Sequence, residues 1–334
     1  MDWEGKIVLI TGGTGSFGQA FCKLLLNDYP VKAVRVYSRD ELKQYEMARK
    51  LTDPRLRFLI GDVRDKERLE RAMIDVDIVV HAAALKQILA CEYNPLEAIK
   101  TNIMGAANVI EAALNSGVKN VIALSSDKAV NPVNLYGATK LCAEKLFVQG
   151  NSYSGAGPTR FSCARYGNVL GSRGSVVPLF YQQKQNGMLT ITDSRMTRFW
   201  ITLPQAVKFV IKRIESMQGG EIFVPKLPSV KVTDLAETIA PGCTTVETGI
   251  RPGEKLHEVL VTEEESRHSR DMGEYYLIEP ENQWWDVVGW EGGVRVDDDF
   301  RYSSDSNERF ISGPELVDLI KETEEYWLTP SAVP

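Results

Sequence analysis

Short apolar runs alternate with longer segments of helical periodicity along the first half of the chain. The apolar runs read KIVLIT, AVRVYS, RFLIGD, DIVVHAAA, NVIALSS and FSCARYGNV. Between them, apolar residues recur at helical spacing and predict helices over residues 17–26, 41–50, 66–73, 95–116 and 135–149. Buried strands separated by helices are typical of a doubly wound parallel sheet. The pattern therefore predicts an α/β fold with a Rossmann domain over residues 1–170.

The alternation loosens after Gly171. The segments SRGSVVP, LPSVKVTDLAETIA and QWWDVVGWEGGV do not continue the regular order of strand and helix. A chain of 334 residues is long enough for two domains. We therefore expect residues 171–334 to form a smaller mixed α/β domain whose helices interleave with the sheet.

Composition narrows the function classes. The chain has 43% hydrophobic and 25% charged residues and a net charge of -6, with neither sign in long blocks, so we expect neither nucleic acid nor a membrane as partner. The five cysteines show no C-x-x-C spacing, and the first residues, MDWEGKIVLI, do not resemble a signal peptide. We therefore expect a reducing, cytoplasmic setting. The three histidines have no metal-binding arrangement, and we expect no metal site.

A glycine-rich loop follows the first predicted strand. KIVLITGGTGSFGQAF places Gly12, Gly15 and Gly18 in a G-x-x-G-x-x-G spacing between a strand and a helix. Glycines allow a tight turn and let the backbone approach a pyrophosphate, whose charge then lies at the positive end of the helix. The position of the loop favours dinucleotide binding over a purely structural turn.

The end of the second predicted strand bears on the choice of dinucleotide. An acid there suits a ribose 2'-hydroxyl, whereas an arginine suits a 2'-phosphate. VYSRDELKQ presents Ser38 and Arg39 first, with Lys43 behind, so the sequence favours NADP. Asp40 leaves NAD open, and the cations could instead be solvated charges at a helix start.

Further cofactor candidates lie at the ends of the next strands. Asp62 and Val63 are placed to reach the adenine, although Asp62 could instead cap a helix. His81 is expected as a core imidazole rather than a catalytic group. The predicted cofactor-binding residues are Gly12, Thr14, Gly15, Ser16, Phe17, Gly18, Ser38, Arg39, Lys43, Asp62, Val63, Ala82, Ala83, Asn102, Tyr136 and Lys140.

The segment SSDKAVNPVNLYGATK concentrates ionisable groups. Tyr136 and Lys140 lie one helical turn apart, and Asp127 and Lys128 directly follow a predicted strand. Beside a nicotinamide, an ammonium and the cationic ring favour the phenolate, so Tyr136 could remove a hydroxyl proton while hydride leaves the same carbon. Ser125 or Ser126 would bind the oxygen. The alternative for Asp127 and Lys128 is an ion pair on a loop.

These motifs as a set resemble those of a known family. The tyrosine, lysine and serine resemble the catalytic triad of extended short-chain dehydrogenases/reductases. TGGTGSFG, YSRDELKQ, GDVRD, HAAALK, YNPLEAIKTNI, SSDKAVNPVNLYGATK, RYGNVLGSRGSVVP, ITDSRMTRFWIT, GGEIFVPK and GIRPGEKLHEVL resemble the C5-inverting UDP-N-acetylglucosamine 4,6-dehydratases, which open the pseudaminic acid pathway. The resemblance covers most of the chain to about residue 260 and leaves residues 263–334 unassigned.

The sequence departs from the family in two places. Ser126 stands where a threonine is usual before Asp127 and Lys128, which keeps a hydroxyl. Gln87, Ile88 and Leu89 replace the usual His-Val-Pro, and we expect this change to face the substrate.

The resemblance implies a hydro-lyase reaction. H5 of the sugar becomes acidic only after C4 is oxidised, so Tyr136 acts first as base, with Ser126 on the oxygen and Lys140 on the ribose. Asp127 and Lys128 then supply the acid and base for loss of water, and hydride returns to C6. The implied product is UDP-2-acetamido-2,6-dideoxy-beta-L-arabino-hexos-4-ulose. A lysine base must be neutral, so we expect burial, Lys140 and the nicotinamide to lower the pKa of Lys128.

The resemblance also implies where the UDP-sugar binds. The predicted substrate-binding residues, most of them in the second half of the chain, are Lys86, Asn168, Arg198, Arg251 and Glu254. Each arginine alone could instead form a structural ion pair. The family further implies a homo-oligomer, possibly a hexamer.

Several other functions remain open. A dehydratase that retains C5 or stops at the 5,6-ene would share these residue types. An NAD-dependent nucleotide-sugar 4-epimerase would share the fold, Tyr136 and Lys140, but it needs no acid/base pair at Asp127 and Lys128. An NADP-binding sensor without catalysis predicts damaged motifs, and none is visible.

Overall fold

The computed structural model describes residues 1–155, 157–171, 175–281, 284–285 and 289–323. Residues 172–174 in SRGSVVP, 282–283 and 286–288 around QWWDVVGWEGGV, and 324–334 of the predicted second domain lie outside the described residues. Within the described part of the chain, no helix has the length and apolar character needed to cross a membrane.

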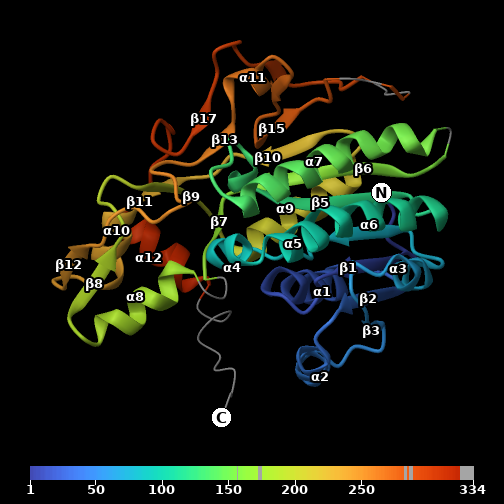
Figure 1. The fold of residues 1–334 in the computed structure, drawn as a ribbon, viewed down its shortest axis with the longest axis horizontal. Coiled ribbons are helices and arrows are strands. Elements are labelled where there is room, and N and C mark those ends of the chain that lie inside the picture. The colour runs from blue at the N-terminus through green and yellow to red at the C-terminus, as the bar shows by residue number, and fades with distance from the viewer. Residues whose placement is uncertain (156, 172–174, 282–283, 286–288, 324–334) are drawn as a thin grey trace.

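A parallel sheet forms the centre of the molecule (Figure 1). Its strands run in the order β3-β2-β1-β4-β5-β6-β10, which makes it a doubly wound parallel sheet, as predicted, with β10 added at one edge of the parallel part. The parallel strands are β1 (Ile7–Thr11), β2 (Ala33–Ser38), β3 (Leu56–Ile60), β4 (Ile78–His81), β5 (Asn120–Ser126), β6 (Arg160–Tyr166) and β10 (Ile222–Pro225). Antiparallel strands continue the sheet beyond β10 as β15 (Tyr275–Ile278), β14 (Ser269–Asp271) and β16 (Val294–Arg295).

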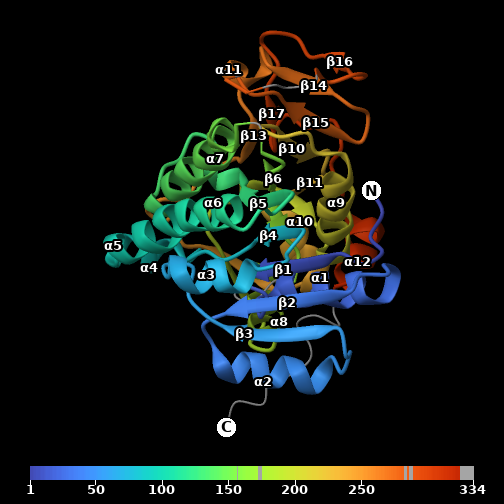
Figure 2. The ribbon, with the colours of Figure 1, turned by 90° about the vertical axis from the view of Figure 1, so that its right-hand side faces the viewer.

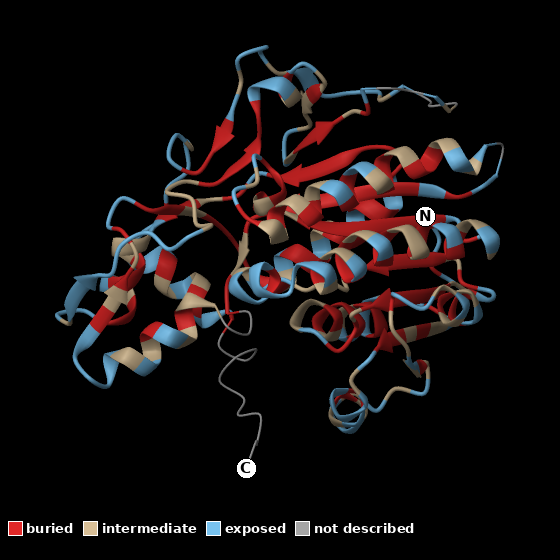
Figure 3. Ribbon diagram, viewed as in Figure 1, coloured by how far each residue is buried: buried red, intermediate tan, exposed pale blue. Residues whose placement is uncertain are grey.

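Helices cover both faces of this sheet (Figure 2). On one face lie α3 (Lys66–Met73), α6 (Gly105–Asn115) and α7 (Leu135–Ser154). On the other face lie α1 (Ser16–Asp28) and α9 (Leu203–Ser216). The strands are buried while the helices expose their outer sides (Figure 3), because strands covered on both faces can be apolar throughout. Helix α2 (Glu41–Lys50) follows β2.

The segment predicted as one helix over residues 95–116 is divided. It consists of α5 (Pro95–Ala98), the π-helical turn η1 (Ile99–Met104) and α6. Helix α4 (Ile88–Tyr93) precedes it and was not predicted. Leu89 and Tyr93 of α4 are 69% and 88% exposed, so its apolar residues do not mark a buried face in the sequence.

The second half of the chain serves both the main sheet and a smaller lobe. Helix α9 and β10 pack on and join the main sheet. A separate hydrophobic cluster joins Phe180, Leu189, Trp200, Leu235 and Leu316. The remaining elements are η2 (Asp127–Ala129), β7 (Asn168–Val169), α8 (Val176–Lys184), β8 (Met188–Ile191), β9 (Thr197–Ile201), β11 (Ser229–Lys231), α10 (Val232–Ile239), β12 (Thr244–Glu247), β13 (Val259–Val261), α11 (Glu263–Ser266), β17 (Tyr302–Ser303) and α12 (Gly313–Lys321). The division at residue 170 stays a prediction.

Candidate active site

A cavity of about 630 Å³ opens at the carboxyl ends of β1, β2, β4 and β5. In doubly wound sheets this edge is where ligands bind. The cavity brings together most of the residues that the sequence singled out. Those that line it are Gly12, Thr14, Gly15, Ser16, Phe17, Gly18, Ser38, Arg39, Lys43, Asp62, Val63, Ala82, Ala83, Lys86, Ser126, Asp127, Lys128, Tyr136, Lys140 and Asn168.

The glycine loop is shaped by contacts that a side chain would obstruct. Gly12 has φ +66°, and a Cβ there would lie 2.9 Å from the Cα of Ala83. A Cβ on Gly18 would overlap the carbonyl oxygen of Gly13, so α1 packs closely under the loop. Gly15 is the N-cap of α1, and its side-chain-free backbone faces the cavity. These residues fit a dinucleotide pyrophosphate at the helix N-terminus.

The end of β2 presents both cations and an acid to the cavity, and the acid is paired at the start of α2. The Asp40 carboxylate caps α2 by accepting from the backbone N–H of Lys43 at 3.0 Å, and the Lys43 ammonium lies 2.8 Å from it. Arg39 is half exposed, with its guanidinium 3.6 Å from Asp62. Of these groups, Asp40 is therefore the least available to a ribose hydroxyl.

Asp62 is not a helix cap. The Arg64 guanidinium donates to its carboxylate at 2.9 and 2.7 Å, whereas the N-cap of α3 is Asp65. The structural alternative for Asp62 in the sequence was thus wrong, and the residue lies on the cavity wall.

His81 is a core imidazole. Its Nδ1 lies 2.8 Å from the Thr11 hydroxyl, and its ring packs against Phe147. Burial lowers the pKa of His81 to about 3. Its burial and its contacts with Thr11 and Phe147 are those expected of a core imidazole.

Asn102 stands behind the cavity wall rather than on it. Its side-chain oxygen accepts from the Leu85 N–H at 2.8 Å, and its amide donates to the Leu85 carbonyl and to the Thr139 hydroxyl, each at 2.9 Å. Asn102 therefore ties the loop after β4 to α7, while Thr101 lines the cavity.

The start of α7 fixes Tyr136 and Lys140 against η2. Asn134 caps the helix by accepting from the Gly137 N–H at 2.7 Å. A Cβ on Gly137 would overlap the carbonyl oxygen of Lys128, so only glycine lets the helix approach so closely. One turn of helix then places Tyr136 and Lys140 on the same side.

The protein alone holds Tyr136 as a neutral phenol. Burial raises the pKa of Tyr136 to about 12 against the opposing charge of Lys128. Lys140 donates to the Leu124 carbonyl at 2.5 Å, and burial lowers its pKa. Lys140 alone therefore does not produce the phenolate that the sequence predicted. The Ser125 hydroxyl is buried at the cavity wall and has no hydrogen-bond partner among the described residues, whereas Ser126 donates to Asp127 at 2.8 Å.

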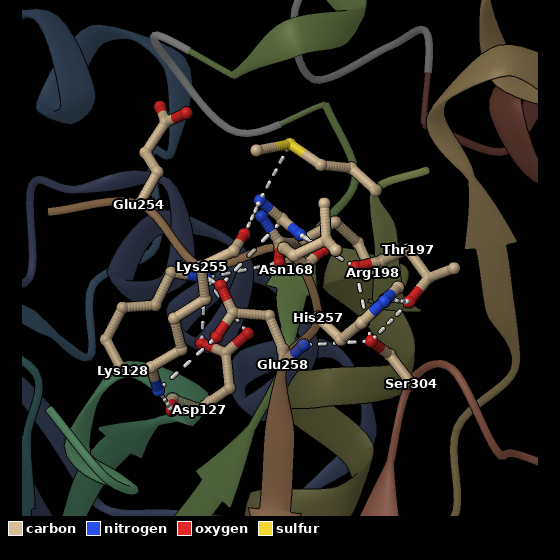
Figure 4. Close-up of polar contacts among 12 residues, drawn as sticks. Asp127, Lys128, Asn168, Thr197, Arg198, Glu254, Lys255, His257, Glu258 and Ser304 are labelled. Atoms are coloured by element: carbon tan, nitrogen blue, oxygen red, sulfur yellow. Dashed lines mark hydrogen bonds and ion pairs between the residues drawn. The ribbon is translucent and has the colours of Figure 1, made fainter. Parts of the chain in front are cut away.

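The buried Asp127 forms an ion pair with the partly buried Lys128, and Glu258 is a second acid beside the same ammonium (Figure 4). The Lys128 ammonium lies 3.0 Å from the Asp127 carboxylate and 2.9 Å from that of Glu258. Although burial lowers the pKa of Lys128, the two carboxylates outweigh it and the pKa is raised. The predicted lowering was wrong, because the sequence did not reveal Glu258.

A smaller cavity of about 140 Å³ adjoins the first and shares Lys128 and Asn168 with it. Arg198 and Glu254 also line it. Ile88 is the member of the Gln87-Ile88-Leu89 departure that faces this cavity. The departure therefore reaches the site through one side chain.

The arginines predicted to bind substrate are placed differently from each other. The Arg198 guanidinium donates to the backbone carbonyls of Thr197, Leu256 and Lys255 at 2.8, 3.0 and 2.9 Å. It thereby shapes the segment that carries Glu258. The Arg251 side chain is 58% exposed, lies 3.7 Å from Glu254 and lines neither cavity.

Glu258 and Lys255 were not predicted as site residues from the sequence. The Lys255 ammonium donates to the Val130 carbonyl at 2.5 Å, just beyond η2, and lies 3.7 Å from Glu258. Both residues belong to GIRPGEKLHEVL, so the motif was found but these members were not. An acid directly before the apolar strand β13 was the available signal.

Comparison with known proteins decides the family. A family model described as polysaccharide biosynthesis protein matches residues 8–280. The chain belongs to this family.

Its relatives include enzymes of two reaction types. A UDP-N-acetylglucosamine 4,6-dehydratase (inverting) of Campylobacter jejuni is 54% identical over 96% of this chain and 98% of its own length. A UDP-glucose 4-epimerase of Rickettsia bellii is 46% identical over 82% of each chain. Among solved structures, Pen from Bacillus thuringiensis superposes with a TM-score of 0.89 at 40% identity, covering 97% of this chain and 99% of that one.

Proposed function

We propose that the protein is a C5-inverting UDP-N-acetylglucosamine 4,6-dehydratase, a hydro-lyase. The observation that carries this proposal is the buried Asp127–Lys128 pair, which lines the same cavity as Tyr136 and the glycine loop. Loss of water across C5 and C6 needs an acid and a base in addition to the group that deprotonates the 4-hydroxyl. The similarity to the Campylobacter jejuni enzyme supports the same reaction. It would supply the first intermediate of pseudaminic acid synthesis.

A nicotinamide dinucleotide fits the larger cavity and would supply the hydride acceptor at C4 and the donor at C6. Gly12, Gly15 and Gly18 leave room for its pyrophosphate. We infer NADP rather than NAD, because Arg39 lines the cavity beside Asp40, and the Asp40 carboxylate is already engaged by the Lys43 backbone N–H and ammonium. NAD stays the alternative.

The remaining residues act on protons and oxygens. Tyr136 would remove the proton of the 4-hydroxyl. The Ser125 hydroxyl, buried at the cavity wall with no described partner, is as well placed as Ser126 to bind that oxygen. One member of the Asp127–Lys128 pair would then accept the proton lost from C5, and the other would donate a proton to the departing 6-hydroxyl.

The substrate would extend from the larger cavity into the smaller one. Lys86 lies exposed at the rim, Asn168 lies between the two cavities, and Glu254 lines the smaller one. Arg198 would act mainly by holding backbone, and Arg251 would reach a UDP group only from the exposed side. Dehydratases that retain C5 or release the 5,6-ene would use the same residues.

A nucleotide-sugar 4-epimerase is the second candidate, because the Rickettsia bellii relative carries that name. Epimerisation needs Tyr136 and Lys140, but it has no step that requires the acid/base pair of Asp127 and Lys128. The mass of the product separates the two: incubation with UDP-N-acetylglucosamine and NADP should yield a nucleotide sugar lighter by one water. A product of unchanged mass would favour the epimerase, and bound cofactor without any turnover would favour an NADP-binding sensor.

We also infer self-association in a cytoplasmic setting. Leu89, Tyr93 and Leu96 of α4 and α5 are 69%, 88% and 66% exposed and would be covered in a homo-oligomer such as a hexamer. All five cysteines are free thiols, which suits a reducing compartment.

A further inference from the structure

Lys128 lies between two carboxylates that are held differently. The Asp127 carboxylate is on its neighbouring residue, receives the Ser126 hydroxyl at 2.8 Å and lies 3.0 Å from the ammonium. The Glu258 carboxylate reaches the same ammonium at 2.9 Å from a segment far along the chain. Asn168 accepts from Lys128 at 3.4 Å on a further side.

The two acids differ in how many cations face them. Arg198 lies 3.8 Å and Lys255 3.7 Å from the Glu258 carboxylate, in addition to Lys128. The backbone of Glu258 is also fixed, because its N–H donates to the Ser304 hydroxyl at 2.9 Å. Asp127 has Lys128 beside it, and Lys255 reaches only its backbone carbonyl. Glu258 is therefore the more strongly neutralised carboxylate.

We infer that Glu258 is a positioning residue whose carboxylate is the fixed counter-ion of Lys128, so that Lys128 exchanges its proton with Asp127 during dehydration. This inference rests on the proposed dehydratase function. Lys128 enters the step as an ammonium, and before it can act as a base it passes a proton across the 3.0 Å to the Asp127 carboxylate. The pair holds one proton before and after this transfer, and Glu258 stays ionised throughout.

The proton affinities agree with this division of roles. Burial raises the pKa of Asp127, only partly offset by Lys128. Burial also acts to raise the pKa of Glu258, but Lys128, Arg198 and Lys255 outweigh it and the pKa is lowered. A proton that leaves Lys128 therefore goes to Asp127. Tyr136 on α7 lies in the same cavity, and burial raises its pKa to about 12; Lys86 and Lys140 line this cavity as well.

The experiment is the pH dependence of dehydration by wild type, Glu258→Gln and Glu258→Asp. Glu258→Gln keeps the shape and removes the charge, so we expect kcat to fall about 10- to 100-fold with KM changed by less than about 3-fold. The alkaline limb of the profile, which reports loss of the proton shared by Asp127 and Lys128, should move down by about one pH unit or more. Glu258→Asp should restore part of both effects. Glu263→Gln, an exposed acid on α11, is the matched control and should behave as wild type.

Two further measurements distinguish a failure of the inference about Glu258 from a failure of the proposed function. Single-turnover oxidation at C4, read from cofactor absorbance, should be unchanged in Glu258→Gln because Tyr136 performs it. NMR of wild type labelled at the lysine Cε should show Lys128 titrating at higher pH than the exposed lysines, and this measurement needs no variant to fold. The inference is overturned if Glu258→Gln keeps the pH profile of wild type, or if Lys128 titrates at lower pH than the exposed lysines. If wild type itself does not dehydrate UDP-N-acetylglucosamine, the proposed function fails instead.

Discussion

The cofactor half and the acid/base half of the cavity are built in different ways. The cofactor half uses short, nearly contiguous segments, and its shape depends on missing side chains at Gly12 and Gly18. The acid/base half depends on charged side chains from distant segments, with Glu258 and Lys255 meeting η2 more than a hundred residues back along the chain. In this chain the glycine-loop surface is therefore local, whereas the charge cluster around Lys128 requires tertiary assembly.

Removing either member of the Asp127–Lys128 pair should cause the largest loss of activity and leave the cofactor-binding part of the cavity intact. Lys128→Ala or Asp127→Asn should lower the dehydration rate by about 10²- to 10⁴-fold, because each removes a proton-transfer group. Cofactor binding, measured by fluorescence titration, should persist. Lys100→Ala, which removes an exposed ammonium paired with Glu97, is the control and should be fully active.

Tyr136→Phe should act one step earlier than these variants. It should abolish oxidation at C4 itself, whereas Lys128→Ala should still oxidise the substrate in a single turnover. Full turnover by Lys128→Ala and Asp127→Asn would contradict the dehydratase proposal and favour the 4-epimerase.

A substitution in the glycine loop should cause the next largest effect, a loss of cofactor affinity. Gly12→Ala would place a methyl group 2.9 Å from the Ala83 backbone, so the loop must shift. We expect the affinity for NADP to fall about 10- to 100-fold, as for other overpacked sites. Gly5→Ala is the matched control, because Gly5 also has positive φ but its Cβ would meet nothing within 4 Å. Equal loss in both variants would mean that backbone strain, and not the closed space at the loop, is responsible.

The smallest effect concerns cofactor choice. Arg39→Ala should weaken NADP about 10-fold and leave NAD nearly unchanged, because only NADP has a phosphate for the guanidinium. Calorimetric titration with both dinucleotides measures the ratio. A parallel loss for the two dinucleotides would place Arg39 away from the 2'-phosphate.

The sequence predicted the doubly wound parallel sheet and the glycine loop because both depend on local patterns. Apolar runs mark buried strands, and the spacing of Gly12, Gly15 and Gly18 is legible without knowledge of the fold. Helix α4 was missed because its apolar side chains are exposed.

The charges around Lys128 could not be derived in the same way. The pKa of Lys128 depends on Glu258, and nothing in the spacing of the two residues indicates that they meet. Likewise, Arg198 looked like a phosphate ligand, but its donors are directed at backbone carbonyls of a segment that folds over it. Ion-pair networks between distant segments are properties of the packing.

Proton NMR of the purified protein with UDP-N-acetylglucosamine and NADP in D2O would follow dehydration and its stereochemistry together. A C5-inverting dehydratase gives the C6 methyl signal of a 4-keto-6-deoxy sugar, deuterium at C5 and ring couplings of the inverted configuration. A C4 epimer without a methyl signal would contradict the dehydratase proposal.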